Sequence, residues 1–335
     1  MPPDPAPLFD HSVAYWRSSV LFTAIELDLF SSLSDGDTLA QLADRIAVPQ
    51  RGLAMLVDSL VALDLLHRDG EALRGSELAA AYLRSSSPGY LGDTILFNAR
   101  SYAAWGDLTA AVRHNRPAMS TTHFLGDDPQ ATRNFVHAMH HRALGVARCL
   151  VDMIDLADSA TLLDLGGGPA TYSALLAERF PNIQATVIDL PGILAVSAEL
   201  LADSPARERV TLSPGDIFAD ETYFATPHDA VLISGVLHRT EGQATIDFLR
   251  KVAPAVRPGG ILAISDLFTG GETNGPVLPE LFSLHMMLTA EQGQSLPLPE
   301  FQGILAAAGF ALESVQPYPS PLPQTLVLAR RLPCP

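Results

Sequence analysis

The chain has 335 residues, of which 47% are hydrophobic and 17% charged, so it can form two domains and has the composition of a folded globular protein. Its formal net charge of −16 repels phosphate backbones and anionic membrane surfaces. We therefore expect neither a nucleic acid nor a membrane as a partner.

The cysteine content and the first residues of the chain indicate the cellular compartment of the protein. The two cysteines, Cys149 and Cys334, are too few for a disulfide framework or a metal cluster. The opening "MPPDPAPLFD" lacks the charged and apolar regions of a signal peptide, and no run of about eighteen apolar residues follows. We expect a soluble cytoplasmic protein.

The segment from Asp10 to about Arg113 has helical apolar spacing. Within it, residues 37–76 predict a helix, a turn, a second helix and a hairpin centred on Asp69-Gly70, which is the order of a winged helix. Such a unit can place its second helix in the DNA major groove. Here four arginines face five acidic residues between Thr38 and Arg74, and the second helix is rich in packing residues. We therefore expect no DNA binding.

From Ala160 onward, short apolar runs alternate with helical ones, which is typical of an α/β fold with a parallel sheet built from βαβ units. The expected strands are 160–166, 185–191, 209–216, 229–238, 259–268 and 324–331. The expected helices between them include 171–180, 193–203 and 242–256. Ligands of open α/β sheets bind at the carboxyl ends of the strands.

Three glycines in "LLDLGGGPATYS" separate the first of these strands from its helix. They let a ligand approach the backbone closely, where a side chain would clash. A dinucleotide fingerprint would place a further glycine at Thr171, so its absence weakens that interpretation. Asp164, just before the glycines, suits an amino group better than a pyrophosphate.

Two more acids end the next strands. Asp189 lies where an acidic residue accepts hydrogen bonds from ribose hydroxyls. Asp216 is placed to meet an adenine amino group, with Ile217 and Phe218 beside the ring. Each acid alone is also explained as a cap of the following helix. Together with the glycines, the three acids favour an adenosine that carries a positive charge.

The motifs "DLGGGPAT", "VIDLP", "GDIF", "VLH" and "VRPGGILAISD" occur in this order over the second half of the chain. With the N-terminal half, they make the chain resemble the class I S-adenosylmethionine-dependent small-molecule O-methyltransferases. The resemblance implies a Rossmann-like sheet with helices on both faces, preceded by a mainly helical winged-helix domain. It places the dimerisation and substrate-pocket domain at 1–150 and the catalytic domain at 151–335.

The resemblance also implies a homodimer in which the N-terminal half of one subunit helps to close the substrate pocket of the other. The cofactor would be S-adenosyl-L-methionine. The residues expected to hold it are Asp164, Gly166, Gly168, Asp189, Leu190, Asp216, Ile217, Phe218 and Ser234.

His238, after the fourth strand, occupies the family's catalytic-base position, and histidine suits the deprotonation of a phenolic hydroxyl near neutral pH. The family follows this histidine with Asp-Trp and an acidic pair, whereas this chain has "RTEG", and a cation at Arg239 would weaken a base beside it. Asp266 matches one family carboxylate. The glutamate expected in a later loop falls on Ser295, and Glu291 is a candidate substitute.

Two functions follow. The leading one is O-methylation of a small aromatic secondary metabolite, with His238 as the base. The alternative is a non-methylating reaction, such as cyclisation, decarboxylation or hydroxylation, in which the bound sulfonium stabilises negative charge. His238 as a strand-end residue without a catalytic role is the structural alternative.

Helices flanking the sheet supply a candidate acceptor pocket. Its residues suit a flat or apolar molecule, and they are Phe97, Tyr102, Trp105, Phe135, Met139, Phe282, His285, Met286 and Met287. His137 and His141 have the i, i+4 spacing of metal ligands, but no third ligand accompanies them. We therefore expect no metal.

Overall fold

The computed structural model describes residues 3–220, 222–270 and 277–333. The chain forms two compact units, Met1–Tyr102 and Ala103–Pro335. The domain boundary predicted after residue 150 falls near the end of a helix, α9 (Pro129–Met153), that packs on two helices of the second unit. Among the described residues, no helix has the length and apolar character to cross a membrane.

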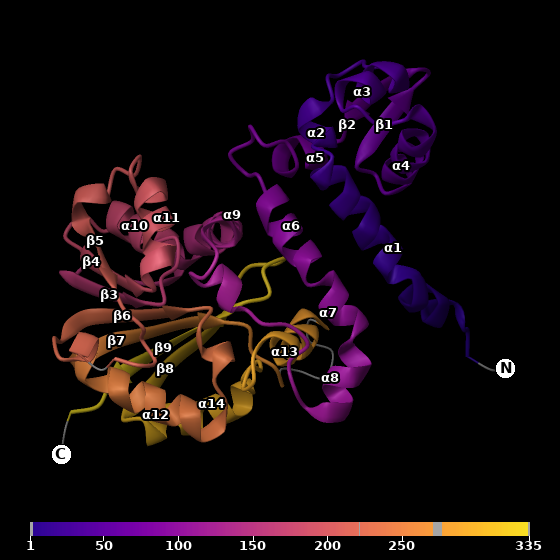
Figure 1. The fold of residues 1–335 in the computed structure, drawn as a ribbon. Coiled ribbons are helices and arrows are strands. Elements are labelled where there is room, and N and C mark those ends of the chain that lie inside the picture. The colour runs from indigo at the N-terminus through magenta and orange to yellow at the C-terminus, as the bar shows by residue number, and fades with distance from the viewer. Residues whose placement is uncertain (1–2, 221, 271–276, 334–335) are drawn as a thin grey trace. The chain divides into compact units, whose positions relative to one another are not determined.

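The N-terminal unit is mainly helical, as predicted, and contains the helix, turn, helix and hairpin order of a winged helix (Figure 1). The hairpin turns at Gly70 and Glu71, where Gly70 has the positive φ of +58° that glycine adopts readily. Its elements are α1 (Ala6–Glu26), α2 (Leu29–Ser32), α3 (Leu39–Arg45), α4 (Gln50–Ala62), β1 (Leu66–Asp69), β2 (Ala72–Gly75), α5 (Glu77–Tyr82) and α6 (Gly92–Arg100). α7 (Tyr102–Gly106) follows.

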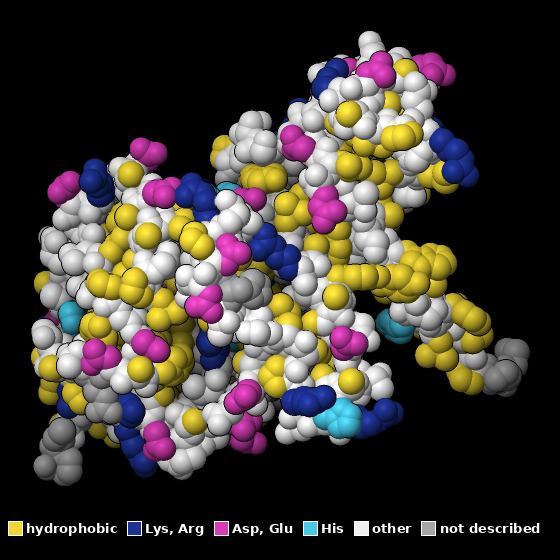
Figure 2. Space-filling view, viewed as in Figure 1, with side chains coloured by type: hydrophobic (Ala, Val, Ile, Leu, Met, Phe, Trp, Pro, Cys, Tyr) yellow, Lys and Arg dark blue, Asp and Glu magenta, His cyan; other side chains and the backbone are white. Residues whose placement is uncertain are grey.

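A single apolar core holds this unit together, and it includes Phe30, Leu42, Leu53, Leu60 and Leu73 from α2, α3, α4 and the hairpin. The amino-terminal part of α1 differs, because its large apolar side chains are exposed: Leu8, Phe9, Tyr15 and Trp16. Figure 2 shows hydrophobic side chains along this helix. Contiguous exposed apolar side chains of this kind mark protein interaction surfaces.

The second unit contains a seven-stranded sheet of order β5-β4-β3-β6-β7-β9-β8. The strands are β3 (Thr161–Leu165), β4 (Gln184–Asp189), β5 (Val210–Pro214), β6 (His228–Ser234), β7 (Val256–Asp266), β8 (Phe310–Pro317) and β9 (Thr325–Arg331). β3 to β7 run parallel, as the βαβ pattern predicted, whereas β9 pairs antiparallel with β7 and with β8. β8 was not predicted.

Helices cover both faces of this sheet, as predicted (Figure 1). Successive strand side chains point to opposite faces: in β6, Ala230 and Leu232 pack with α9, α10 (Thr171–Arg179) and α11 (Pro191–Leu201), whereas Val231 and Ile233 pack with α12 (Gly242–Val252) and α14 (Leu298–Ala307). The remaining helices are α8 (Leu108–His114), α13 (Val277–Thr289), η1 (Thr122–Phe124), η2 (Arg207–Arg209), η3 (Thr222–Phe224), η4 (Leu237–Arg239) and η5 (Ala253–Ala255).

At the amino ends of the strands, Asp229 joins β6 to the start of β3. Its Oδ2 accepts hydrogen bonds from the backbone N–H groups of Ala160 (2.6 Å) and Thr161 (3.0 Å), and its carboxylate also pairs with Arg257. Burial raises the pKa of this carboxyl, but these donors and the arginine outweigh burial, so the pKa lies below its ordinary value. Asp229 therefore stabilises the end of the sheet opposite the candidate site.

Candidate active site

The predicted functional residues of the second unit gather at the carboxyl ends of the parallel strands. β3 leads into Gly166, β4 ends at Asp189, β6 ends at Ser234 and β7 ends at Asp266. The strand registers pair Leu165 with both Ile188 and Ile233, and Ser234 with Ser265. Since these strands are neighbours in a parallel sheet, the residues that follow them share one edge, where ligands of such sheets bind.

The glycine turn between β3 and α10 is held in a conformation that other residues adopt with strain. Gly166 and Gly168 have φ of +67° and +52°. A Cβ on Gly166 would lie 2.7 Å from Cγ2 of Val236, whereas one on Gly168 would meet nothing within 4 Å. Gly168 therefore borders open space, and Gly166 allows the loop after β6 to approach the turn.

Asp164 lies beneath this turn and is completely buried. Its Oδ2 accepts a 2.7 Å hydrogen bond from the Ser173 hydroxyl, and in the described part of the chain its Oδ1 has no partner. Burial raises the pKa of the Asp164 carboxyl to about 7, although the Ser173 hydrogen bond opposes this change. Ser173 was not predicted, since this contact depends on the return of the chain through the glycines.

Asp189 connects the glycine turn to α11. Its Oδ2 accepts from the backbone N–H of Gly168 at 2.8 Å, and its Oδ1 accepts from that of Leu190 at 2.7 Å. The pKa of this carboxyl lies above its ordinary value, because burial outweighs the two backbone hydrogen bonds and the charge of Arg239, which lower it. Each oxygen has one of its acceptor positions occupied, so each can accept a further hydrogen bond.

The residues after β5 form an exposed acid followed by apolar side chains. Asp216 is exposed and its Oδ1 accepts from the N–H of Phe218 at 2.9 Å. Ile217 is buried, whereas Phe218 is 40% exposed and its ring lies 4.9 Å from that of Phe248. Ser234, at the end of β6, shares a side-chain hydrogen bond with the half-buried Tyr172.

His238 pairs with Asp266. β6 ends at Ser234, before the predicted end of the strand, and His238 stands on the short helix η4. Its Nδ1 lies 2.9 Å from Oδ1 of Asp266, and its side chain is 14% exposed. An ionised carboxylate can only accept, so Nδ1 is the donor, and in the neutral imidazole Nε2 is then the nitrogen with the lone pair. The arrangement is that of a general base oriented by a carboxylate.

Two backbone contacts support this pair. Oδ1 of Asp266 also accepts from the N–H of Leu267 at 2.8 Å, and the carbonyl of His238 accepts from the N–H of Gln294 at 2.9 Å. Neither Leu267 nor Gln294 was predicted, because a backbone N–H leaves no signal in side-chain type. The loop after α13 thus fixes His238 through its main chain.

The other charged candidates lie elsewhere. Glu291 is exposed, and among the described residues no hydrogen bond or ion pair joins it to His238. Ser295, where the resemblance placed a glutamate, is buried and its hydroxyl donates to the carbonyl of Pro279. Arg239 is exposed. The structure therefore brings only Asp266 of the predicted acids into contact with His238.

Aromatic rings extend from His238 along α13. The ring of Phe282 meets His238 edge to face at 5.0 Å, and that of His285 lies 5.9 Å from Phe282. Trp105 stacks on His285 at 6.3 Å with 10° between the planes. Burial, with the charges of Arg142 and His238, lowers the pKa of His285 to about 4. The imidazole of His285 is therefore neutral near pH 7.

The remaining pocket candidates are less closely tied to this group. Phe135 packs with Leu190 in a small cluster between α9 and α11. Met139 and Met286 are half-buried in the second unit, and Phe97 lies on α6 of the N-terminal unit. The structure thus joins Trp105 and His285 to His238 through Phe282, and places Phe135 beside the predicted cofactor residue Leu190.

Of the α9 histidines, His140 contacts the start of α10, just after the glycine turn. Its Nδ1 lies 2.8 Å from the Thr171 hydroxyl, and burial, with the charges of His141 and His137, lowers the pKa of His140 to about 4. In the described ranges, no group of three His, Cys, Asp or Glu side chains is arranged to hold a metal ion.

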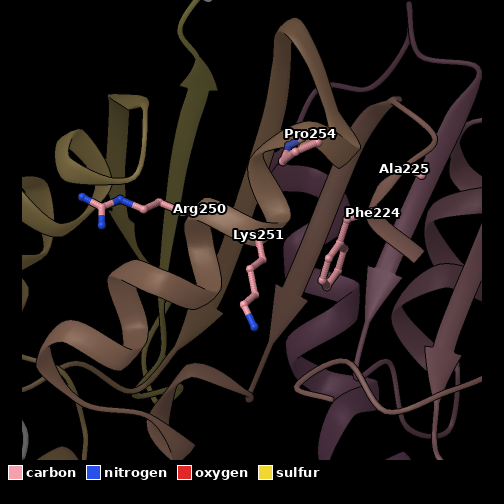
Figure 3. Close-up of a pocket in the computed structure, with 5 residues that line it drawn as sticks. All are labelled: Phe224, Ala225, Arg250, Lys251 and Pro254. Carbon is pink, nitrogen blue, oxygen red and sulfur yellow. The ribbon is translucent and has the colours of Figure 1, made fainter. Parts of the chain in front are cut away.

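A hollow of about 390 Å³ lies at the other end of the sheet (Figure 3). Its lining comes from segments that precede β6 and β7: Phe224, Ala225, Arg250, Lys251 and Pro254. Figure 3 shows the side chain of Arg250 directed away from the ring of Phe224. Since the hollow contains none of the predicted site residues, it is separate from the edge that carries His238.

Two family models match this chain. The family model described as the O-methyltransferase domain matches residues 105–311. The chain belongs to this O-methyltransferase family. A second model, the O-methyltransferase dimerisation domain, matches residues 9–85. The chain is thus a member of an S-adenosylmethionine-dependent family and has the two-part organisation that its motifs indicated.

Individual relatives cover nearly the whole chain. It is 30% identical to the tetracenomycin polyketide synthesis 8-O-methyl transferase of Streptomyces glaucescens, over 98% of this chain and 97% of that protein. It is 29% identical to the 3-hydroxy-5-methyl-1-naphthoate 3-O-methyltransferase of Streptomyces sahachiroi, over 85% and 83%. The crystal structure of human N-acetylserotonin methyltransferase with S-adenosylmethionine superposes with a TM-score of 0.87 at 25% identity, covering 99% of each chain.

The residues at the sheet edge suit this cofactor. Adenosine offers hydroxyl and amino donors, and the Asp189 oxygens retain acceptor capacity beside the open space at Gly168. Asp164 supplies a buried oxygen without a partner in the described part of the chain. The lining acids also favour a ligand with positive charge.

Proposed function

We propose that this protein methylates a hydroxyl of a small aromatic secondary metabolite, with His238 as the general base. The observation that carries the proposal is the 2.9 Å contact between His238 Nδ1 and Asp266 Oδ1. It leaves Nε2 as the basic nitrogen in a site where one buried carboxylate orients the ring. The relatives that act on tetracenomycin and naphthoate skeletons support an aromatic acceptor.

In this reaction the cofactor supplies an electrophilic methyl group on a sulfonium. His238 Nε2 would take the proton of the acceptor hydroxyl and Asp266 would stabilise the imidazolium that results, while the cofactor, on giving up its methyl group, would leave as S-adenosylhomocysteine. Positioning of the two reactants contributes the larger share, on the order of 7 to 11 kcal/mol for well-oriented groups. The aromatic rings of Phe282, His285 and Trp105 exclude water from the acceptor.

The cofactor would be held by residues around the glycine turn. Asp189 would accept hydrogen bonds from the ribose hydroxyls, and Asp216 would accept one from the adenine amino group. Asp164 would accept one from the amino group of the methionyl end. Further contacts would come from Gly166, Gly168, Leu190, Ile217, Phe218 and Ser234. The acceptor would contact Trp105, Phe135, Met139, His285 and Met286.

We also propose a homodimer. The match of residues 9–85 to the dimerisation domain and the exposed apolar side chains of α1 support it. Burial of such side chains in an interface would release about 25 cal/mol per Å² of apolar surface. In this arrangement the N-terminal domain of one subunit would close the pocket of the other.

Replacing His238 with alanine tests the proposal. We expect turnover to fall by a factor of at least about 100, because a positioned general base contributes that much, while the affinity for S-adenosylhomocysteine stays within twofold. His114→Ala, at an exposed histidine of α8, is the matched control and should leave both unchanged. An unchanged rate for His238→Ala would show that another group removes the proton.

The altered residues after His238, together with Ser295, are compatible with the non-methylating alternative. Since Arg239 is exposed and Asp266 contacts His238, these changes leave the carboxylate–histidine pair present. This favours methyl transfer over the alternative.

A further inference from the structure

A series of aromatic rings on α13 and α7 leads away from His238, the proposed base. Phe282 and His285 are three residues apart on α13, so they project from the same side of that helix. The ring centroids are separated by 5.0 Å from His238 to Phe282 and by 5.9 Å from Phe282 to His285. An acceptor with its hydroxyl at His238 that extends past Phe282 by a second fused ring would meet His285.

His285 presents a polar edge within this apolar group. Its ring is half-buried and stacks on Trp105, and in the described part of the chain its nitrogens make no hydrogen bond or ion pair to protein. A neutral imidazole has one donor nitrogen and one acceptor nitrogen. Each would lose solvent when an acceptor lies against the ring, and an unpaired buried polar group is costly.

We propose that His285 hydrogen-bonds a second oxygen of the acceptor, carried on a different ring from the hydroxyl that is methylated. The acceptor class is then fused polycyclic phenols with a hydroxyl or carbonyl oxygen distant from the reacting one. This inference rests on the proposed function, because His238 fixes where the reacting hydroxyl lies. His285 acts here as a specificity-determining residue and takes no proton from the reacting oxygen.

The neutral state of His285 decides which oxygen groups it accepts. Because burial, Arg142 and His238 hold its pKa near 4, it carries no charge at pH 7. It can therefore donate to a carbonyl oxygen or accept from a hydroxyl. A purely apolar second ring satisfies neither nitrogen, which makes 2-naphthol a poorer ligand than naphthalene-2,6-diol.

The test is calorimetric binding of 2-naphthol and naphthalene-2,6-diol to the full chain saturated with S-adenosylhomocysteine, at pH 7. For the wild-type protein we expect the diol to bind about threefold to tenfold more tightly, beyond the twofold advantage of its two equivalent hydroxyls. His285→Phe keeps the stacking ring and removes both nitrogens, so the preference should fall to about twofold. His285→Gln, which keeps a donor and an acceptor, should retain most of it.

His114→Phe, the same replacement at an exposed histidine, is the control and should keep the full preference. Each variant is first shown to bind S-adenosylhomocysteine as the wild type does. A preference unchanged in His285→Phe, no preference in the wild type, or no binding of either compound would overturn the inference. Since binding requires no methyl transfer, such a result is distinguishable from failure of the His238→Ala test.

Discussion

The replacement of Asp189 by asparagine should weaken cofactor binding, for a reason visible in its two contacts. Both carboxylate oxygens accept a backbone N–H, at 2.8 Å from Gly168 and 2.7 Å from Leu190. An amide has only one oxygen, so one of these N–H groups would face an NH₂ group. Hydrogen bonds to a charged group contribute about 1.5 to 3 kcal/mol each, and the ribose hydroxyls would also lose a charged acceptor.

The loss of one charge-assisted hydrogen bond between Asp189 and a ribose hydroxyl corresponds to about a 10-fold to 150-fold weaker affinity for S-adenosylhomocysteine. Isothermal titration calorimetry of the variant measures it directly. The matched control is Asp155→Asn, because this exposed aspartate also accepts a backbone N–H, that of Ala157 at 3.0 Å, at the opposite end of β3. It should bind the cofactor product as the wild type does.

Thermal unfolding separates this effect from damage to the fold. We expect Asp189→Asn to remain folded at the temperature of the titration. If it binds S-adenosylhomocysteine with wild-type affinity, the assignment of Asp189 to the ribose is wrong. If Asp155→Asn weakens binding equally, the loss of affinity is not specific to the carboxylate beside the glycine turn.

Three further changes test other parts of the structure. Gly166→Ala should lower the free energy of unfolding by about 1 to 3 kcal/mol, because the new Cβ meets Val236 at a positive φ; an unaltered melting temperature would contradict the contact. Asp229→Asn should cost about 2 kcal/mol at pH 7 in urea titrations; since the wild-type carboxyl has a lowered pKa, its contribution is present above about pH 4 and lost below it, so the variant should approach the wild type in acid. Asp266→Asn should reduce turnover by at least tenfold with cofactor affinity unchanged, and equal turnover would show that His238 needs no carboxylate.

The strands and glycine turn could be predicted because their signals are local. The apolar runs that became β3, β4 and β6 lie between glycines, acids and helical segments, so both their type and their order follow from the sequence. β8 was not predicted, because it is an edge strand whose sequence, "FALESVQP", contains few branched or aromatic residues.

The sequence indicated candidate side chains for the site, but it carried little signal for the contacts between them. His238, Asp266 and Glu291 were all candidates from the sequence, and the structure brings His238 and Asp266 into contact. The end of β6 at Ser234, four residues before His238, could not be read from a continuous apolar run. Likewise, Gln294 contributes a backbone N–H that any residue with the same conformation supplies.

The central claim is methyl transfer to a phenolic oxygen, and product analysis with methyl-labelled S-adenosylmethionine tests it most directly. The protein is incubated with the labelled cofactor and a panel of phenols that includes 2-naphthol and naphthalene-2,6-diol. The account predicts label in an aryl methyl ether, with one S-adenosylhomocysteine formed for each ether. An acceptor that is altered without gaining label, or no labelled ether from any phenol, would contradict it.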